Sequence, residues 1–126
     1  MVEQAGDALA AHQTITISPT RAAELWRSGE ATFVDVRRPY EREAGRIEGS
    51  SHIEMNELSG RAGEVTKDRP VVFYCRSGNR SAMVAEAFRQ AGWDAYHIDG
   101  GLAAWVEEGL PLDPPDGTVR DPLPGS

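Results

Sequence analysis

Residues 71–81 read VVFYCRSGNRS and combine two kinds of pattern. The first four are apolar and follow a proline, as in a strand that is buried on both faces. After a short loop that contains a glycine, an apolar stripe recurs at helical spacing, made of Met83, Val84, Ala87, Phe88 and Ala91. Gly92 then ends this helix. The sequence therefore predicts a strand, a tight loop and a helix, with Cys75 at the carboxyl end of the strand.

The same alternation of strands and helices extends to both sides of this stretch. Alternating or apolar runs predict strands at residues 14–17, 31–36, 51–53, 71–74 and 95–98. Helical spacing, proline starts and glycine stops predict helices at residues 19–28, 39–44, 57–62, 83–91 and 102–108. The pattern is weakest over residues 46–69. Because strands that alternate with helices form parallel sheets, we expect an α/β fold with a mainly parallel central sheet of about five strands and helices on both faces.

The length of 126 residues is that of one domain. We expect the folded domain to span residues 14–110, after a flexible N-terminal extension at residues 1–13. Residues 111–126 hold five prolines and little apolar periodicity, which predicts an irregular or mobile Pro-rich tail.

The charge balance narrows the range of partners. Thirteen basic and twenty acidic side chains give a formal net charge of −7, which argues against a surface for nucleic acid or anionic lipid. The first residues lack the basic and apolar regions of a signal peptide, and no run approaches the length of a membrane span. We therefore expect a cytoplasmic protein that has neither nucleic acid nor a membrane as its partner.

Cys75 is the single cysteine of the chain. An intrachain disulfide, a CxxC redox pair and a multi-cysteine zinc site are therefore excluded. The three histidines, His12, His52 and His97, lie far apart without metal-ligand spacing, so no metal is expected. A lone cysteine after a buried strand is more often an inert apolar residue than a nucleophile. The residues of the loop that follows discriminate between these two interpretations.

The loop from Arg76 to Ser81 predicts an anion-binding site. In open parallel sheets, ligands bind beyond the carboxyl ends of the strands, where this loop is expected. Main-chain N–H groups of a glycine-containing loop and of a helix N-terminus can converge on one anionic centre. Together with Arg76 and Arg80 they would favour the thiolate form of Cys75, which is the nucleophilic form. The loop therefore favours the nucleophile over the inert residue.

Three motifs in this order resemble the single-domain rhodanese family: VDVR at residues 34–37, CRSGNRS at residues 75–81 and DGGLAAW at residues 99–105. The resemblance implies a sulfurtransferase in which Cys75 takes a sulfane sulfur from thiosulfate or a similar donor and becomes a persulfide. The sulfur would then pass to cyanide, a thiol or a protein acceptor. No metal or organic cofactor is implied.

The resemblance also implies roles for the neighbouring residues. Those that would hold the persulfide and orient the anionic donor are Arg76, Ser77, Gly78, Asn79, Arg80 and Ser81. Asp35 and Arg37 would support the fold beside the site. One segment departs from the family, because residues 45–50 read GRIEGS where members usually read GHIPGA. The preference for a sulfur donor or the stiffness of this loop can therefore differ from that of other family members.

Loop length separates sulfur chemistry from phosphorus chemistry. Cys75 and Arg80 enclose four residues, whereas the related phosphatases and cysteine phosphatases generally have five at this point. The shorter loop suits a single sulfur atom and disfavours a phosphoryl group. The main alternative is a persulfide carrier or binding module that receives sulfur from a protein partner. A redox thiol enzyme would need a resolving thiol from another molecule.

Overall fold

The computed structural model describes residues 15–121, in which five strands form one sheet. The strands are β1 (Thr16–Ile17), β2 (Thr32–Asp35), β3 (Ser51–His52), β4 (Val71–Tyr74) and β5 (Ala95–Ile98). Their order in the sheet is β1-β5-β4-β2-β3, and every neighbouring pair is parallel. The predicted α/β fold with a five-stranded parallel sheet is confirmed. The expected N-terminal extension lies outside the described residues.

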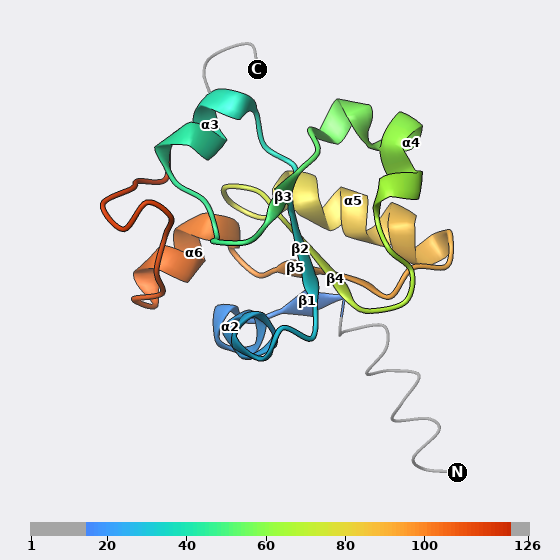
Figure 1. Cartoon of the computed structure of the whole chain (residues 1–126), viewed down its shortest axis with the longest axis horizontal. Coiled ribbons are helices and arrows are strands. Elements are labelled where there is room, and N and C mark those ends of the chain that lie inside the picture. The colour runs from blue at the N-terminus through green and yellow to red at the C-terminus, as the bar shows by residue number, and fades with distance from the viewer. Residues whose placement is uncertain (1–14, 122–126) are drawn as a thin grey trace.

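Helices cover both faces of the sheet, as predicted (Figure 1). The α-helices are α2 (Pro19–Ser28), α3 (Pro39–Ala44), α4 (Leu58–Arg61), α5 (Asn79–Gln90) and α6 (Gly101–Glu107). Buried side chains of α2 and α6 pack on one face, and those of α4 and α5 pack on the other. Within residues 15–121, no helix is both long and apolar enough to cross a bilayer.

The side chains of β4 alternate between the two cores. Val71 and Phe73 lie in the core beneath α5, and Cys75 continues this series directly after the strand. Val72 and Tyr74 lie in the opposite core, beneath α2 and α6. All four strand residues are fully buried. Because successive side chains of a strand point to opposite faces, the register of β4 places the cysteine on the side of α5.

The region between β3 and β4 differs from the sequence prediction. One short helix was expected near residues 57–62, but the chain forms three consecutive short turns: η1 (Met55–Glu57), α4 (Leu58–Arg61) and η2 (Ala62–Glu64), where η denotes a 3-10 helix. The apolar residues that anchor this region to the core are few, since only Leu58 and Val65 are buried between residues 55 and 69. A long amphipathic helix has no continuous apolar stripe here to hold it.

Residues 111–121, which we call the C-terminal strap, have no helix or strand but pack along the domain. The Trp105 indole donates a hydrogen bond to the carbonyl of Pro111 at 2.7 Å. The main chains of Arg46 and Asp113 bond to one another in both directions. The amide of Thr118 then donates to the carbonyl of Ala44, at the end of α3. The strap therefore runs from α6 to α3 (Figure 1).

Candidate functional site

The Cys75 sulfur faces the main chain of the loop that follows it. The Gly78 amide donates to Sγ at 3.1 Å, and the Ser81 amide lies 3.4 Å from it. The Ser81 hydroxyl also lies 3.4 Å from the sulfur. Gly78 has a φ of 102°, a conformation that glycine adopts without steric cost. The two amides at the start of α5 form a cradle that suits a negatively charged sulfur. Cys75 itself is 1% exposed.

The N-terminus of α6 is hydrogen-bonded to the start of this loop. The amide of Leu102 donates to the Cys75 carbonyl at 2.8 Å, and the amide of Ala103 donates to the Arg76 carbonyl at 3.0 Å. Gly101, at a φ of +64°, lies so close that a Cβ there would be 2.5 Å from the Arg76 carbonyl oxygen. The turn at Gly100 and Gly101 therefore brings α6 against the loop.

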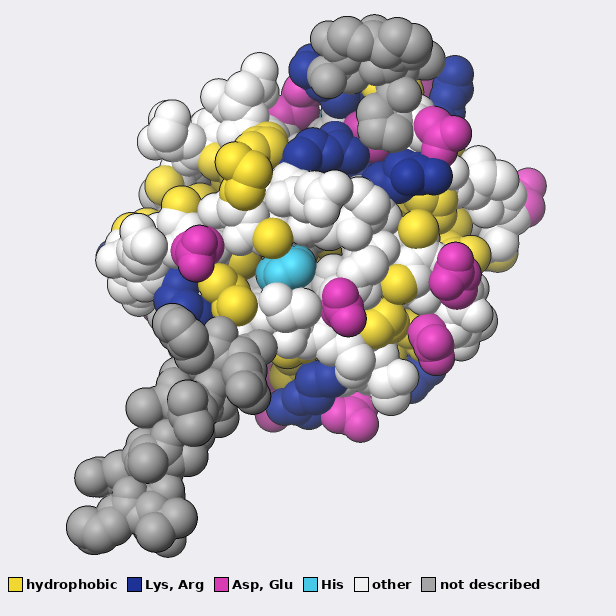
Figure 2. Space-filling view, turned by 180° about the vertical axis from the view of Figure 1, so that it is seen from behind, with side chains coloured by type: hydrophobic (Ala, Val, Ile, Leu, Met, Phe, Trp, Pro, Cys, Tyr) yellow, Lys and Arg dark blue, Asp and Glu magenta, His cyan; other side chains and the backbone are white. Residues whose placement is uncertain are grey.

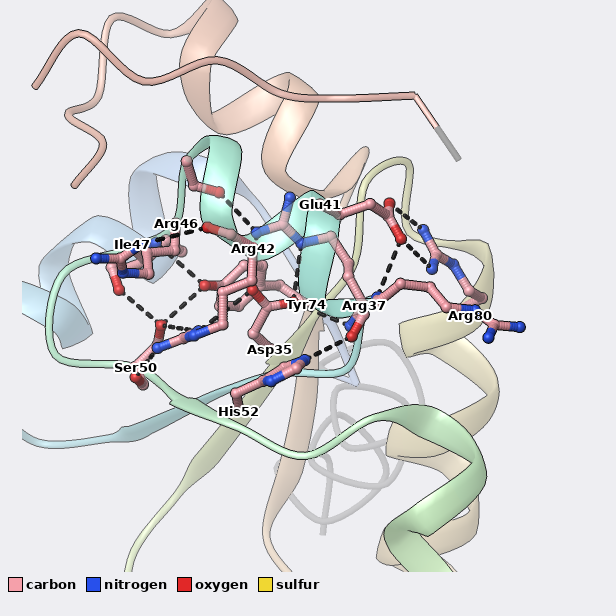
Figure 3. A network of polar contacts seen from close by, with 12 residues as sticks. Asp35, Arg37, Glu41, Arg42, Arg46, Ile47, Ser50, His52, Tyr74 and Arg80 are labelled. Carbon is pink, nitrogen blue, oxygen red and sulfur yellow. Dashed lines mark hydrogen bonds and ion pairs between the residues drawn. The ribbon is translucent and has the colours of Figure 1, made fainter. Parts of the chain in front are cut away.

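Arg80 points to a carboxylate that no pattern in the sequence had indicated as part of the site. Its two terminal nitrogens lie 3.0 and 2.9 Å from the two oxygens of Glu41 on α3. Glu41 is fully buried and also accepts a hydrogen bond from the Arg38 amide. Figure 3 shows the Arg80 guanidinium facing Glu41. The hydrogen bonds that Arg80 donates to Glu41, together with the negative charge of this carboxylate, raise the pKa of Arg80.

Arg76 also pairs with a carboxylate, at the far end of the strap. Its Nη2 lies 2.6 Å from Oδ1 of Asp121. From the sequence, the charges of Arg76 and Arg80 are expected to act on the sulfur. In the structure each guanidinium also pairs with a carboxylate, and the charge of Cys75 is among the causes that raise the pKa of Arg80. Ser77 and Asn79 are exposed, and among the described residues the hydrogen bonds donated to Sγ come from the amides of Gly78 and Ser81.

Basic and acidic side chains are mixed on the surface of this protein. In Figure 2 several basic side chains lie toward the upper edge of the face shown, with acidic side chains beside them, and more of both kinds lie across the rest of the face. The same edge carries α3 in Figure 1. The formal net charge of the whole chain is −7, so acidic side chains outnumber basic ones overall.

Asp35 and Arg37 form a buried ion pair beside the site. Arg37 Nε donates to Asp35 Oδ1 at 2.8 Å, and Nη2 lies 2.7 Å from Oδ2. The same Nη2 donates to the Gly45 carbonyl at 2.7 Å. Burial opposes the charge of Arg37, but the hydrogen bond and attraction from Asp35 outweigh it and raise the pKa of Arg37. The pair ties the end of β2 to the end of α3.

The segment GRIEGS at residues 45–50 is part of the same network (Figure 3). The Tyr74 hydroxyl accepts a hydrogen bond from the Ile47 amide at 3.1 Å and lies 2.8 Å from the Ser50 hydroxyl. Arg46 pairs with Asp113 of the strap at 3.5 Å. The serine and arginine that depart from the usual family residues therefore have defined partners: Ser50 binds the end of β4, and Arg46 binds the strap.

Neither described histidine contacts the sulfur. His52 Nε2 lies 2.6 Å from the Arg37 carbonyl, and His97 Nε2 lies 2.8 Å from the Thr16 hydroxyl. Burial lowers the pKa of His97. In residues 15–121, no group of three or more His, Cys, Asp or Glu residues could hold a metal ion. The main-chain amides are thus the polar groups that face Cys75, together with the Ser81 hydroxyl.

Tyr74 gives the network a measurable pH dependence. Burial, followed by the negative charge of Asp35, raises the pKa of its phenol to about 12. An unfolded tyrosine loses its proton near pH 10. The unfolded state therefore binds fewer protons than the folded state above that pH, and stability should fall by about 2–3 kcal/mol between pH 10 and pH 12. Urea unfolding across this range measures the change.

The matched variant for this prediction is Tyr74→Phe. It loses the hydrogen bonds to Ile47 and Ser50, so it should be less stable at pH 8. Between pH 10 and pH 12, however, its stability should fall less steeply than that of the wild type, because the titrating group is gone. Equal slopes for the two proteins would contradict this assignment.

Comparison with known families identifies the domain. The model of the rhodanese-like domain matches residues 18–108. The chain belongs to the rhodanese-like family. A sulfurtransferase of Allochromatium vinosum is 37% identical over 101 residues, which cover 79% of this chain and 94% of that protein. The resemblance inferred from the three motifs is confirmed, and sulfur transfer is supported at the level of the family.

Other similar proteins carry different descriptions. An HTH-type transcriptional regulator of Mycobacterium tuberculosis is 42% identical over 99 residues, which are 75% of this chain and 43% of the regulator. This chain thus spans less than half of that relative. A solved rhodanese-related protein of Thermoplasma volcanium has a TM-score of 0.70 and 33% identity, over 77% of this chain and 95% of its own. A protein of Rhodopseudomonas palustris, described as a possible tyrosine phosphatase, also has a TM-score of 0.70, with 31% identity over 81% of this chain and 87% of its own.

Proposed function

We propose that this rhodanese-like domain is a sulfurtransferase that carries sulfane sulfur on Cys75 as a persulfide. The observation that carries the proposal is the position of Sγ, which faces the amides of Gly78 and Ser81. Such donors stabilise a thiolate before the reaction and an anionic terminal sulfur after it. The loop of six residues from Cys75 to Arg80 supports sulfur rather than a phosphoryl group as the cargo.

The proposed reaction has two steps, each a displacement at sulfur. The Cys75 thiolate attacks the outer sulfur of thiosulfate, the sulfur–sulfur bond of the donor breaks, and sulfite leaves with the bonding electron pair. The product is a cysteine persulfide with its negative charge on the terminal sulfur. Cyanide then attacks that sulfur, thiocyanate leaves, and the thiolate is regenerated. The Gly78 and Ser81 amides stay in place through both steps.

The first test is the formation of thiocyanate from thiosulfate and cyanide. We expect turnover by the wild type and no turnover above background by Cys75→Ala, because the variant has no atom to carry the sulfur. Intact-mass measurement after thiosulfate treatment should show a gain of one sulfur atom in the wild type alone. Thiocyanate formation by Cys75→Ala at the wild-type rate would refute the proposal.

A control variant separates loss of the nucleophile from damage to the fold. Cys75→Ser replaces sulfur with a weaker nucleophile of similar shape, so it should be inactive while its circular dichroism spectrum and its urea midpoint stay close to those of the wild type. Cys75 lies in the core beneath α5, so a large loss of stability in Cys75→Ala would mark a packing effect.

A second candidate is a persulfide carrier loaded by a protein donor. The observation in its favour is that both loop arginines are already paired with carboxylates, Glu41 and Asp121, so a small anion must compete for them. Treatment with a cysteine desulfurase and cysteine discriminates the two candidates. A mass gain of one sulfur from the desulfurase without any gain from thiosulfate would favour the carrier.

A further inference from the structure

The C-terminal strap ends on the loop that follows Cys75. It is fastened to α6 by the Trp105–Pro111 hydrogen bond and to α3 by the Thr118–Ala44 hydrogen bond. Between these points, Leu112 packs against the core beneath α2 and α6. Farther along, the Arg120 guanidinium lies 5.7 Å from the centre of the Tyr40 ring. These contacts fix the path of the strap, and the carboxylate of the next residue, Asp121, lies against Arg76.

The two loop arginines are held in different ways. The partner of Arg80 is Glu41, whose side chain is 0% exposed. The partner of Arg76 is Asp121, whose side chain is 78% exposed, and the side chain of Arg76 is itself 37% exposed. Ion pairs between exposed groups are weak and are screened by salt. A dissolved anion can therefore displace Asp121 from Arg76, whereas Glu41 is shielded from such exchange.

Arg76 also has a hydrogen-bond donor to spare. Its Nε is buried and has no partner among the described residues. An arginine presents its donors as a planar fork that binds oxyanions through two hydrogen bonds. Asp121 contacts Nη2, so an oxyanion that reached both Nη2 and Nε would satisfy a donor that the carboxylate leaves unpaired.

We propose that Asp121 sets the donor selectivity of this domain by competing with anionic sulfur donors for Arg76. The inference rests on the proposed function, since it names the residue that admits the donor. The strap carboxylate occupies the guanidinium in the resting protein, and an incoming oxyanion replaces it. The strap thus lowers the reactivity of Cys75 toward anionic reagents relative to neutral ones.

A pair of alkylating reagents tests this independently of sulfur transfer. Iodoacetate is anionic and iodoacetamide is neutral, and both react with the Cys75 thiolate by the same displacement of iodide. In Asp121→Asn, the ratio of the iodoacetate rate to the iodoacetamide rate should rise by about two- to fivefold, the range expected for an exposed ion pair. The rise should vanish in 1 M salt, where such a pair is screened.

Two controls identify the cause of any change. Asp116→Asn removes an equal charge from an exposed position of the same strap and should leave the ratio at its wild-type value. In an Arg76→Gln background, Asp121→Asn should have no effect on the ratio, because the guanidinium for which the two anions compete is absent. An unchanged ratio in Asp121→Asn, an equal rise in Asp116→Asn, or no reaction with either reagent would overturn the inference.

The sulfur-transfer assay then separates this inference from the proposed function. Asp121→Asn should lower the KM for thiosulfate by about two- to fivefold, with an unchanged kcat, because the competition acts on donor binding. If no thiocyanate forms but the alkylation ratio rises, the proposed function fails and the competition for Arg76 stands. If thiocyanate forms but neither the KM nor the ratio changes, the sulfurtransferase stands and the role of Asp121 is refuted.

Discussion

Replacing Arg37 with methionine should lower the free energy of unfolding by about 3–5 kcal/mol, the range for breaking a buried ion pair. The side chains of Arg37 and Asp35 are both 0% exposed, so the substitution leaves a carboxylate without its main partner in the interior. Nη1 of Arg42 lies 3.3 Å from Oδ2 of Asp35 and still balances part of the charge of this carboxylate. The expected loss of stability is therefore near the lower end of the range. Urea unfolding of the two proteins at pH 7 measures the difference.

The matched control is Arg21→Met. Arg21 pairs with Glu24 at 2.9 Å, but the two side chains are 55% and 58% exposed. Removing such a surface pair should cost less than about 1 kcal/mol. If Arg37→Met is no more destabilising than Arg21→Met, the buried pair does not support the fold beside the site.

Replacing Gly101 with alanine should also have a large effect. It should lower the free energy of unfolding and displace the loop that follows Cys75. A Cβ at this position would lie 2.5 Å from the Arg76 carbonyl oxygen and 2.6 Å from that of Cys75. The loop and α6 must move apart to relieve these contacts, which breaks the hydrogen bonds from Leu102 and Ala103 to the same two carbonyls. The loss of two such bonds is worth about 1–3 kcal/mol beyond the backbone strain.

Gly109→Ala measures the cost of the backbone strain without the steric clash that Gly101→Ala also introduces. Gly109 also has a positive φ, of +79°, but no atom lies within 4 Å of the Cβ that alanine would add. It should cost only the strain of a left-handed alanine, about 1–2 kcal/mol. Gly101→Ala should exceed this loss in urea unfolding and should also slow the alkylation of Cys75. Equal stabilities, with equal alkylation rates, would show that α6 does not hold the loop.

The fold was predictable because its signals are local. Proline starts, glycine stops and short apolar runs mark β4, α5 and β5, and the order of these elements implies a parallel sheet. The position of Cys75 follows from the same signals, since the strand ends where the apolar run ends. Residues 55–64 were less predictable because three single turns carry no periodicity that a sequence pattern can reveal.

The partners of the loop arginines could not be predicted from the sequence. Glu41 stands 39 positions from Arg80, and nothing in its local pattern distinguishes it from an exposed acidic residue in the first turn of a helix. Its burial depends on how α3 packs beside the loop. Asp121 lies in a segment without periodicity, whose path is set by separate contacts to α6 and α3. Such pairings exist only once the tertiary structure is formed.

The central place of β4 in the sheet has a consequence for how long the cysteine keeps its position. β4 pairs with β2 on one side and with β5 on the other, so its amides open to solvent only when the middle of the sheet comes apart. In native-state hydrogen exchange, such strands belong to the last unit to unfold. Because Cys75 is joined directly to this strand and its carbonyl accepts a hydrogen bond from α6, the strand end that positions its sulfur persists as long as the global fold. Fraying at the edge strands β1 and β3 would leave that position unchanged.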